Sequence, residues 1–516
     1  MTLEGFLAGL GPREPGHRPV PRHMLGREGW NALIERLRHD QGWSLVGEWA
    51  EVRAGVARVH LCLRDETGTG VGQGVGQGLA VASLSCPDGR FPSLSLVRPA
   101  AIRFERAIQD LFGLTAEALV DPRPWLDHDT WPVRAPLSLA PPPPLSPPPI
   151  YGFLPAEGEG LHQIPVGPVH AGIIEPGHFR FTCNGETVVR LEERLGYAHK
   201  GIEAAIQGRH LADAARLAAR VSGDSTAAHG LAFARAVEAA TGCRVPPRAV
   251  WLRALMAEIE RVANHFGDIG AICNDAAFAF MLAECGALRE LVLRATDRAF
   301  GHRLMMDAIV PGGVSIDPVA SAMDALAALL PELTRRFADL VRTYDGKSSL
   351  QDRTVATGRV DGGLVRRFAA GGHVGRASGR GHDARRSPGY EPYGELAFDI
   401  PVFDEGDVNA RVWVRIREVE QSLGLIGQIL ARLPGGPVHA GVPQVAGEGI
   451  AFVEAFRGEI MTWVSLDADG TVLRCHPRDA SWLQWPLLEA AIDGNIVADF
   501  PLCNKSFNCS YSGHDL

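Results

Sequence analysis

The segment RVSGDSTAAHGLAFARAVEAA, residues 220–240, contains side chains that could bind a metal ion or move a proton. Ser222 and Ser225 are three residues apart, and His229 follows four residues after the second serine. Hydroxyl oxygens and an imidazole nitrogen can each offer a lone pair to a metal or accept a proton. The same residues also predict an ordinary helix, because Asp224 or Ser225 is a good N-cap for the apolar positions that follow at helical spacing. The segment alone favours the helix.

Composition excludes several broad classes of function. The chain has 516 residues, enough for two or three domains, and its net charge of −9 argues against nucleic acid or anionic lipid as the main partner. Nine scattered cysteines without a CxxC pair predict free thiols in a reducing compartment. No apolar run approaches the ~20 residues that span a bilayer, and residues 1–30 do not have the order of a signal peptide. We expect a cytoplasmic protein that could dock on a membrane protein.

A proline-rich stretch, APLSLAPPPPLSPPPI at residues 135–150, divides the chain. Prolines have no amide donor and favour extended polyproline geometry, so this stretch predicts a semi-rigid linker. The linker separates a domain at 1–134 from a domain at 151–516. The first predicts a small α/β domain and the second a helical bundle with strands around it, so the overall fold class is α+β.

Local patterns predict the individual elements of both domains. In the first domain we expect helices at 30–37 and 101–114 and strands at 57–64 and 79–86. In the second, WLRALMAEIERVANHF at 251–266 has an amphipathic helical pattern, and strand patterns return from about 395, as in 458–475. VPGGVS at 310–315 predicts a tight turn that needs glycine. The glycine-rich run at 68–78 has no strand–helix context, so it carries little weight as a dinucleotide motif.

Several longer motifs occur in an order that resembles one known family. They are VGPVHAGIIEPGHFRF (166–181), RLGYAHKGIE (194–203), RVSGDSTAAHGLAFARAVE (220–238), MAEIERVANH (256–265), IVPGGV (309–314), GRASGRGHDAR (375–385) and EAFRGEIMTWV (454–464). On these motifs, 160–516 resembles the large subunit of energy-converting nickel–iron (NiFe) hydrogenases and its relative, the quinone-site subunit of respiratory complex I. Residues 24–134 resemble the small peripheral-arm subunit of complex I, here fused to the large one. The resemblance implies a hydrogenase-large-subunit-like second domain with a central helical bundle and peripheral β elements.

The resemblance also implies where a nickel–iron centre would bind, and the chain departs from the family there. The hydrogenase loop R-x-C-G-x-C-x-x-x-H has its two ligand cysteines at Ser222 and Ser225 of this sequence. The closing D-P-C-x-x-C motif aligns its two cysteines with Ser510 and Gly513. A serine hydroxyl is a hard ligand that holds soft, low-valent nickel weakly. We therefore expect no nickel–iron centre and no metal bound by this chain.

Two other cofactor hypotheses stay open. Cys503 and Cys509 could replace the missing thiolates only if their loop shifts its register. The quinone-headgroup tyrosine of complex I falls at Gly223, and a second histidine of its loop falls at Ile174, whereas His170 keeps the first. Quinone binding is therefore possible but not in the usual arrangement.

A set of residues that could handle protons is retained. Glu175 matches the hydrogenase glutamate that passes protons, and Arg457 matches the arginine above the metal centre. Both are buried in that family, so we expect a buried carboxylate and guanidinium with perturbed pKa values, for which a structural ion pair is the alternative. His170 and His229 join them as catalytic candidates. Residues expected to shape the cavity, support it or face a partner are His178, His199, Arg376, Asp383 and Arg385, with His265 as scaffold.

Three functions follow from the resemblance. The first is the large peripheral subunit of a membrane-associated oxidoreductase complex on the inner face of the bacterial cell membrane, with electron transfer coupled to ion translocation. Its expected partners are a small iron–sulfur subunit that holds the cluster, a ferredoxin-like subunit and antiporter-like membrane subunits, and any NADH linkage belongs to the complex. The second is a non-catalytic scaffold of an ion-translocating complex. The third, a functional nickel–iron hydrogenase, requires the ligand assignment to be wrong.

Overall fold

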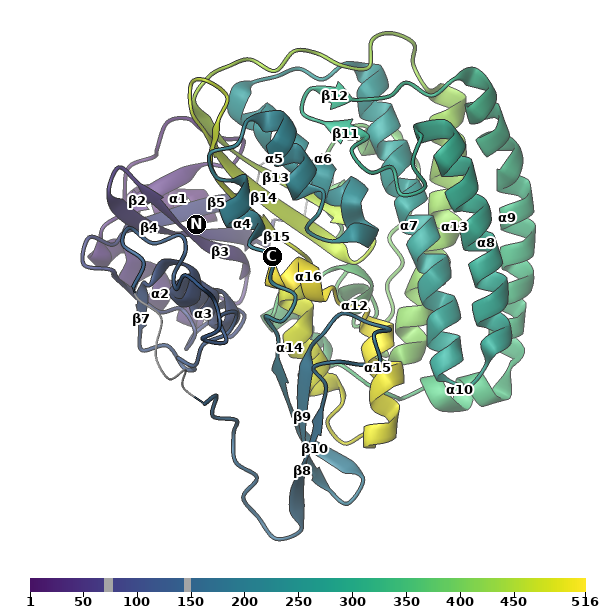
Figure 1. The fold of residues 1–516 in the computed structure, drawn as a ribbon, viewed down its shortest axis with the longest axis horizontal. Coiled ribbons are helices and arrows are strands. Elements are labelled where there is room, and N and C mark those ends of the chain that lie inside the picture. The colour runs from purple at the N-terminus through teal and green to yellow at the C-terminus, as the bar shows by residue number, and fades with distance from the viewer. Residues whose placement is uncertain (69–77, 143–149) are drawn as a thin grey trace.

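The computed structural model describes residues 1–68, 78–142 and 150–516 (Figure 1). Most of the glycine-rich run at 68–78 and part of the proline-rich stretch at 135–150 lie outside these ranges. The described chain combines open sheets with a large group of helices, so the α+β prediction is confirmed. Among the described residues, no helix is both long and apolar enough to cross a membrane.

The first domain is a four-stranded sheet covered by helices. The strands lie in the order β2-β5-β4-β3, with β2 parallel to β5 and the other pairs antiparallel. Their bounds are β2 (Arg22–Leu25), β3 (Trp43–Arg53), β4 (Val56–Asp65) and β5 (Leu79–Ser85). The helices are α1 (Leu3–Leu10), α2 (Arg27–His39) and α3 (Ala101–Phe112), and β6 (Arg90–Pro92) pairs with β7 (Thr115–Glu117). The helices and strands expected here are confirmed within a few residues.

Long helices dominate the second domain. The bundle consists of α7 (Pro247–Asp275), α8 (Ala279–Phe300), α9 (Ala320–Gly346) and α13 (Val408–Arg432). In Figure 1 these four helices lie at the side of the molecule far from the first domain. The helix expected at 251–266 is the middle of α7. Shorter helices are α4 (Ile202–Ile206), α5 (Leu211–Ala218), η1 (Gly223–Ser225), α6 (Thr226–Thr241), α10 (Ser348–Thr354), α11 (Gly362–Arg367), α12 (Gly372–Arg376), η2 (Arg385–Gly389) and η3 (Tyr393–Glu395).

Three sheets and the C-terminal helices complete the second domain. An antiparallel sheet of β13 (Gly447–Ala455), β14 (Gly458–Leu466) and β15 (Val472–Arg478) packs against α6, and β8 (Leu161–Val166), β9 (His178–Asn184) and β10 (Thr187–Arg194) form another. The turn expected at 310–315 joins β11 (Ile309–Val310) to β12 (Gly313–Val314). Gly312 has a φ of 87° there, and a Cβ atom would lie 2.2 Å from the Ala440 carbonyl oxygen. The chain ends with α14 (Ser481–Ala491), η4 (Val497–Asp499), α15 (Phe500–Phe507) and α16 (Tyr511–Asp515).

The two domains are joined by backbone pairing, a shared core and ion pairs. Strand β1 (His17–Arg18), near the start of the chain, adds to the second domain's sheet by pairing in parallel with β13. One apolar core cluster includes Trp30 of the first domain and Trp485 of the second. Across the boundary, Arg103 pairs with Glu193 at 2.9 Å. The C-terminal segment therefore lies between the first domain and the bundle (Figure 1).

Candidate functional site

A bidentate ion pair joins the turn between β13 and β14 to the loop that precedes α6. Arg457 Nη2 donates to Asp224 Oδ2 at 2.6 Å, and Nη1 donates to Asp224 Oδ1 at 2.7 Å. Nη1 also donates to Ser225 Oγ at 3.1 Å, and Nε donates to the Asn508 carbonyl at 2.6 Å. We call the cluster of Ser222, Asp224, Ser225, Arg457 and Ser510 the Asp224–Arg457 site.

Serine hydroxyls complete this site from two distant parts of the chain. Ser222 Oγ donates to Asp224 Oδ1 at 2.8 Å and lies 2.9 Å from Ser510 Oγ, at the N-cap of α16. The Gly513 backbone N–H donates to Ser510 Oγ at 2.9 Å. The structure therefore brings together the four positions that the resemblance assigns to ligand cysteines, although 288 residues separate Ser222 from Ser510.

Each charge of the ion pair stabilises the ionised form of the other residue. Burial opposes ionisation of Asp224, but the Arg457 guanidinium outweighs it and lowers the carboxyl pKa to about 2. Burial also opposes the charge on Arg457, whose pKa is nevertheless raised by Asp224. The two ends differ in exposure, because 37% of the Asp224 side chain is exposed and only 4% of the Arg457 side chain. Asp224 is thus an ionised group that a second molecule can reach.

His229 lies beside the site in a buried pair of its own. Its Nε2 lies 3.1 Å from Asp479 Oδ2, and both side chains are 1% exposed. Burial raises the pKa of Asp479, but its contacts with His229 and the charge of Arg457 outweigh this and lower it well below the usual range. Asp479 Oδ1 accepts the backbone N–H of Ser481 at 2.8 Å. Within the described residues, His229 Nδ1 has no hydrogen-bond partner.

These residues do not fit a nickel–iron centre. Three of the four ligand positions offer hard hydroxyls, which suit soft nickel poorly, and Gly513 offers no side chain. A Cβ atom at position 513 would lie 2.8 Å from Asp479 Cγ, so Asp479 occupies the space that a fourth thiolate would need. Burial raises the pKa of the Cys503 thiol to about 11 and that of Cys509 well above its usual value, which disfavours either as a thiolate ligand. In the described ranges, no group of three or more His, Cys, Asp or Glu side chains is placed to hold a metal ion.

Glu175 departs from its prediction. It is exposed in the loop between β8 and β9, and its Oε2 accepts the backbone N–H of Ser512 at 3.0 Å. The burial expected of Glu175 is wrong, and so is the alternative of an ion pair with Arg457, because Asp224, in the loop before α6, binds both terminal guanidinium nitrogens instead. The Glu175 loop reaches only as far as the start of α16.

The three other predicted histidines contact backbone carbonyls. His170 Nε2 lies 2.8 Å from the Gly177 oxygen, and His178 Nδ1 lies 3.3 Å from the Gly167 oxygen, so both brace the β8–β9 loop. His199 Nδ1 lies 2.7 Å from the Asp515 carbonyl oxygen, and its ring stacks on Trp131. These contacts anchor the β8–β9 loop and, through His199, the end of α16.

Arg376, Asp383 and Arg385 are at most 3% exposed, so within the described chain they offer almost no surface to a partner. Arg376 Nη2 lies 2.6 Å from Glu418, and Arg385 lies 2.8 Å from Asp383. The counter-charges come from α7, α13 and β13, which enclose the 375–385 segment. We call this cluster the inner arginine network; its members are Arg376, Arg385, Asp383, Glu258, Glu418, Glu454, Arg261 and His265.

Sequence reasoning missed two carboxylates, and it placed the N-cap of α6 correctly but not the bond that caps the helix. The sequence pattern presents Asp224 only as an N-cap, although its place between two serines of the ligand motif could have signalled it. No local sequence pattern marks Asp479 as a residue of the site. Ser225 occupies the N-cap position of α6, but its side chain makes no capping bond; its hydroxyl donates to Asp224 Oδ1 at 3.2 Å and accepts from Arg457 Nη1 at 3.1 Å.

Profiles of three protein families match the chain. The family described as respiratory-chain NADH dehydrogenase, 30 Kd subunit, matches residues 27–142. The nickel-dependent hydrogenase family matches residues 200–267, and respiratory-chain NADH dehydrogenase, 49 Kd subunit, matches residues 272–447. Together they define a class of fused peripheral subunits with a small-subunit domain followed by a large-subunit domain.

Individual relatives agree with these profiles. Formate hydrogenlyase subunit 5 of Escherichia coli (strain K12) is 31% identical over 82% of this chain and 77% of that protein. The carbon monoxide-induced hydrogenase of Rhodospirillum rubrum is 31% identical over 67% of this chain and 97% of that protein. An NADH-quinone oxidoreductase subunit of Roseiflexus sp. (strain RS-1) is 31% identical over 65% of this chain and 94% of that protein.

A solved structure has the same fold. A chain of the membrane-bound sulfane sulfur reductase (MBS), an archaeal respiratory membrane complex, superposes with a TM-score of 0.66 at 27% identity and covers 69% of this chain and 99% of that chain. The chain belongs to the family that unites energy-converting hydrogenase large subunits with the 49 Kd subunit of respiratory-chain NADH dehydrogenase, and a domain of the 30 Kd-subunit type is fused ahead of it.

Proposed function

We propose that this chain is the large peripheral subunit of a membrane-associated oxidoreductase complex that works without a nickel–iron centre. The observation that carries the proposal is the Asp224–Arg457 ion pair, which fills the place of the metal ligands with groups that can hold charge and protons. Electrons would come from an iron–sulfur cluster in a neighbouring small subunit, and an acceptor of quinone type or another small redox molecule would receive them.

The proposed complex lies on the cytoplasmic face of the bacterial membrane. We infer a small iron–sulfur subunit, a ferredoxin-like subunit and antiporter-like membrane subunits as partners. The similarity to a chain of an archaeal respiratory membrane complex supports this assembly. The absence of a membrane-spanning helix among the described residues is compatible with a peripheral position.

A row of polar groups suggests how protons reach the site. Exposed Glu175 accepts the backbone N–H of Ser512, which holds it beside this residue but cannot relay a proton. A proton from Glu175 would pass to the Ser512 hydroxyl, whose Oγ lies 3.5 Å from Ser510 Oγ, at the long end of hydrogen-bond distance. Ser510 is bonded to Ser222, and Ser222 to Asp224. When a bound acceptor takes up an electron pair, Arg457 would stabilise the negative charge, and one proton for each charge would arrive along this row from solvent. Glu175 and His229 are the proposed proton-exchanging groups.

The proposal is tested on the complex purified from its native host. Nickel analysis should give no stoichiometric nickel, and electron transfer from a reduced viologen dye to a soluble quinone should fall at least tenfold in Asp224→Asn while the subunits stay assembled. Arg457→Lys, which keeps the charge but not the two-pronged geometry, should behave in the same way. About one nickel per chain, lost on replacing Cys503 or Cys509, would overturn the ligand assignment.

A scaffold role is the second candidate function. It is favoured by the way in which Asp224 and Arg457 satisfy each other inside the chain, which leaves no need for a substrate. Under this alternative, Asp224→Asn destabilises the complex without a specific loss of electron transfer in the assembled fraction. The same experiment therefore separates the two candidates.

A further inference from the structure

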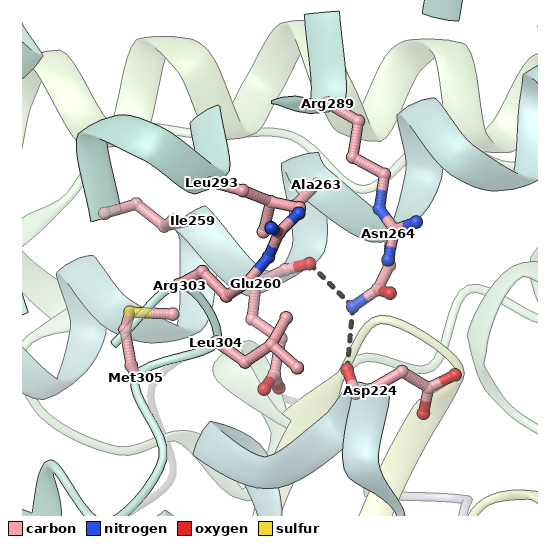
Figure 2. Close-up of a pocket in the computed structure, with 10 residues that line it drawn as sticks. All are labelled: Asp224, Ile259, Glu260, Ala263, Asn264, Arg289, Leu293, Arg303, Leu304 and Met305. Carbon is pink, nitrogen blue, oxygen red and sulfur yellow. Dashed lines mark hydrogen bonds between the residues drawn. The ribbon is translucent and has the colours of Figure 1, made fainter. Parts of the chain in front are cut away.

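A small cavity lies between α7 and the segment that leads into α6, and Glu260 and Asn264 of α7 line it (Figure 2). The two residues are four apart, so their side chains leave the same face of the helix. The cavity has a volume of about 10 Å³, which is about the space that one water molecule needs. Asp224 lines its other side, so the cavity lies directly behind the Asp224–Arg457 site.

Both α7 residues hold the segment that carries Asp224. Glu260 Oε2 accepts the backbone N–H of Ala227 at 2.7 Å, and Oε1 accepts that of Ala228 at 3.1 Å. Asn264 Nδ2 donates to the Asp224 carbonyl oxygen at 2.7 Å (Figure 2). The side chain of the α6 N-cap residue, Ser225, bonds to none of the first backbone amides of the helix. Glu260 takes over this capping role from a different helix.

The charges around Glu260 leave its carboxyl group without a bound cation. Its side chain is buried, and within the described residues it forms no ion pair. Arg289 and Arg303 line the cavity, but the carboxyl group points away from their guanidinium groups in Figure 2. Arg261 on the same helix is bound to Glu258 and Glu418 instead. Burial raises the pKa of Glu260 to about 8, and the negative charge of Asp224 adds to the effect.

We propose that Glu260 and Asn264 form a clamp that sets the position of Asp224 opposite Arg457, and that the clamp tightens when Glu260 loses its proton. An ionised carboxylate accepts both amide hydrogens at the positive end of α6 with charge-assisted bonds. In a carboxylic acid one oxygen carries the proton and accepts hydrogen bonds poorly, so one of the two amide bonds becomes weaker. The hydroxyl group can then turn toward the cavity. Glu260 is thus a positioning residue that makes the site sensitive to pH. Its effect on turnover rests on the proposed function, whereas the clamp itself does not.

The test is amide hydrogen exchange of the 221–231 segment in the purified complex at pH 7 and pH 9, corrected for the intrinsic rate at each pH. In the native protein, protection of this segment should rise about tenfold over that interval. Glu260→Gln resembles the protonated acid, with one acceptor and one donor group, so it should keep the lower protection at both pH values. Glu332→Gln, the same change on an exposed part of α9, should leave the native response intact.

Further variants and outcomes make the test decisive. Asn264→Ala should lower protection at both pH values and keep the pH response, because it removes only the bond to the Asp224 carbonyl. Equal protection of the native segment at pH 7 and pH 9, or an unchanged pH response in Glu260→Gln, would overturn the clamp. Should Glu260→Gln not accumulate, the native pH series alone decides. If the clamp responds as described but Asp224→Asn transfers electrons normally, the clamp stands and the proposed function fails.

Discussion

The Asp224–Arg457 site and the inner arginine network are both clusters of carboxylates and guanidinium groups, yet they differ in exposure. Arg376 and Glu418 are at most 1% exposed, and their charges are satisfied wholly within the second domain. Asp224 is 37% exposed, although its partner Arg457 is nearly buried. The network is therefore inaccessible to any second molecule, whereas the site has one face open to a partner or substrate.

This difference shows that a motif's residue types do not reveal its role. Both clusters lie in segments that the family resemblance singled out; Arg457 was expected at the site, and Arg376, Asp383 and Arg385 were expected to shape the cavity or face a partner. A fully buried set of ion pairs stabilises the fold only while every pair is complete. When one partner is removed, the other charge is left buried with neither a counter-charge nor water around it. In the site only the Asp224 side of the pair is exposed, so this carboxylate can exchange protons with its surroundings although Arg457 cannot. Substitutions in the network should therefore lower mainly the stability of the complex, whereas substitutions in the site should lower mainly its turnover.

The largest effect on stability is expected in the network. Arg376→Ala removes a guanidinium bound to Glu418, Glu454 and Asp383, which leaves Glu454 without an ion-pair partner among the described residues and takes one counter-charge from each of the other two. We expect a loss of about 3–5 kcal/mol and little assembled complex. Thermal melting and the yield of complex check this. Near-native melting of Arg376→Ala would show that the network is not structural.

The next effect concerns pH and Glu260. A glutamate has a pKa of about 4.3 in an unfolded chain, whereas that of Glu260 is raised to about 8 in the fold. Between these values the folded state binds more protons than the unfolded chain, so the free energy of global unfolding falls as pH rises, by up to about 1.4 kcal/mol per pH unit. This differs from local opening of the clamp, which breaks the two amide bonds while Glu260 stays buried and is opposed by ionisation. Glu260→Gln should remove this part of the pH dependence. Melting of the complex at pH 5, 6.5 and 8 measures it, and parallel curves for the two proteins would contradict it.

The sequence predicted the fold better than the site because the two depend on different information. Helices such as 101–112 and strands such as 56–65 follow from periodicity along the chain, which the sequence shows directly. The turn at 310–315 follows from the conformation that Gly312 adopts. Within the site, the convergence of Ser222 with Ser510 was expected from the family's ligand motifs.

The partners of each charged side chain could not be predicted in the same way. Arg457 could bind Glu175 or Asp224, and the choice depends on where the loop before α6 lies, which α7 determines through Glu260 and Asn264. Asp479 enters the site only because β15 ends beside α16. The capping of α6 by another helix likewise depends on tertiary packing, which no local pattern encodes.

A smaller stability effect is expected at the site itself. Asp224→Asn removes the counter-charge of the nearly buried Arg457, but the introduced amide oxygen and the Asn508 carbonyl still accept its hydrogen bonds, so we expect a loss of about 1–2 kcal/mol, less than in the network. Electron transfer should fall far more than the amount of assembled complex. Melting and turnover of the same preparation test this contrast with Arg376→Ala. A variant that loses several kcal/mol but no specific turnover would place the site with the network.

The smallest effect on stability is expected at Glu175. Gln in its place can still accept the hydrogen bond of the Ser512 backbone N–H, and the side chain is exposed. The free energy of unfolding should therefore change by no more than about 0.5 kcal/mol, with a correspondingly small shift in melting temperature. If Glu175 exchanges protons with the serine row, Glu175→Gln slows turnover several-fold because it cannot ionise, and Glu175→Asp, which still ionises, restores part of the rate. Turnover of the two variants between pH 6 and pH 8 measures this. Equal rates for Gln and the native residue would remove Glu175 from the proton route while leaving the Asp224–Arg457 site as the reacting centre, since the exposed face of Asp224 gives protons a second way in.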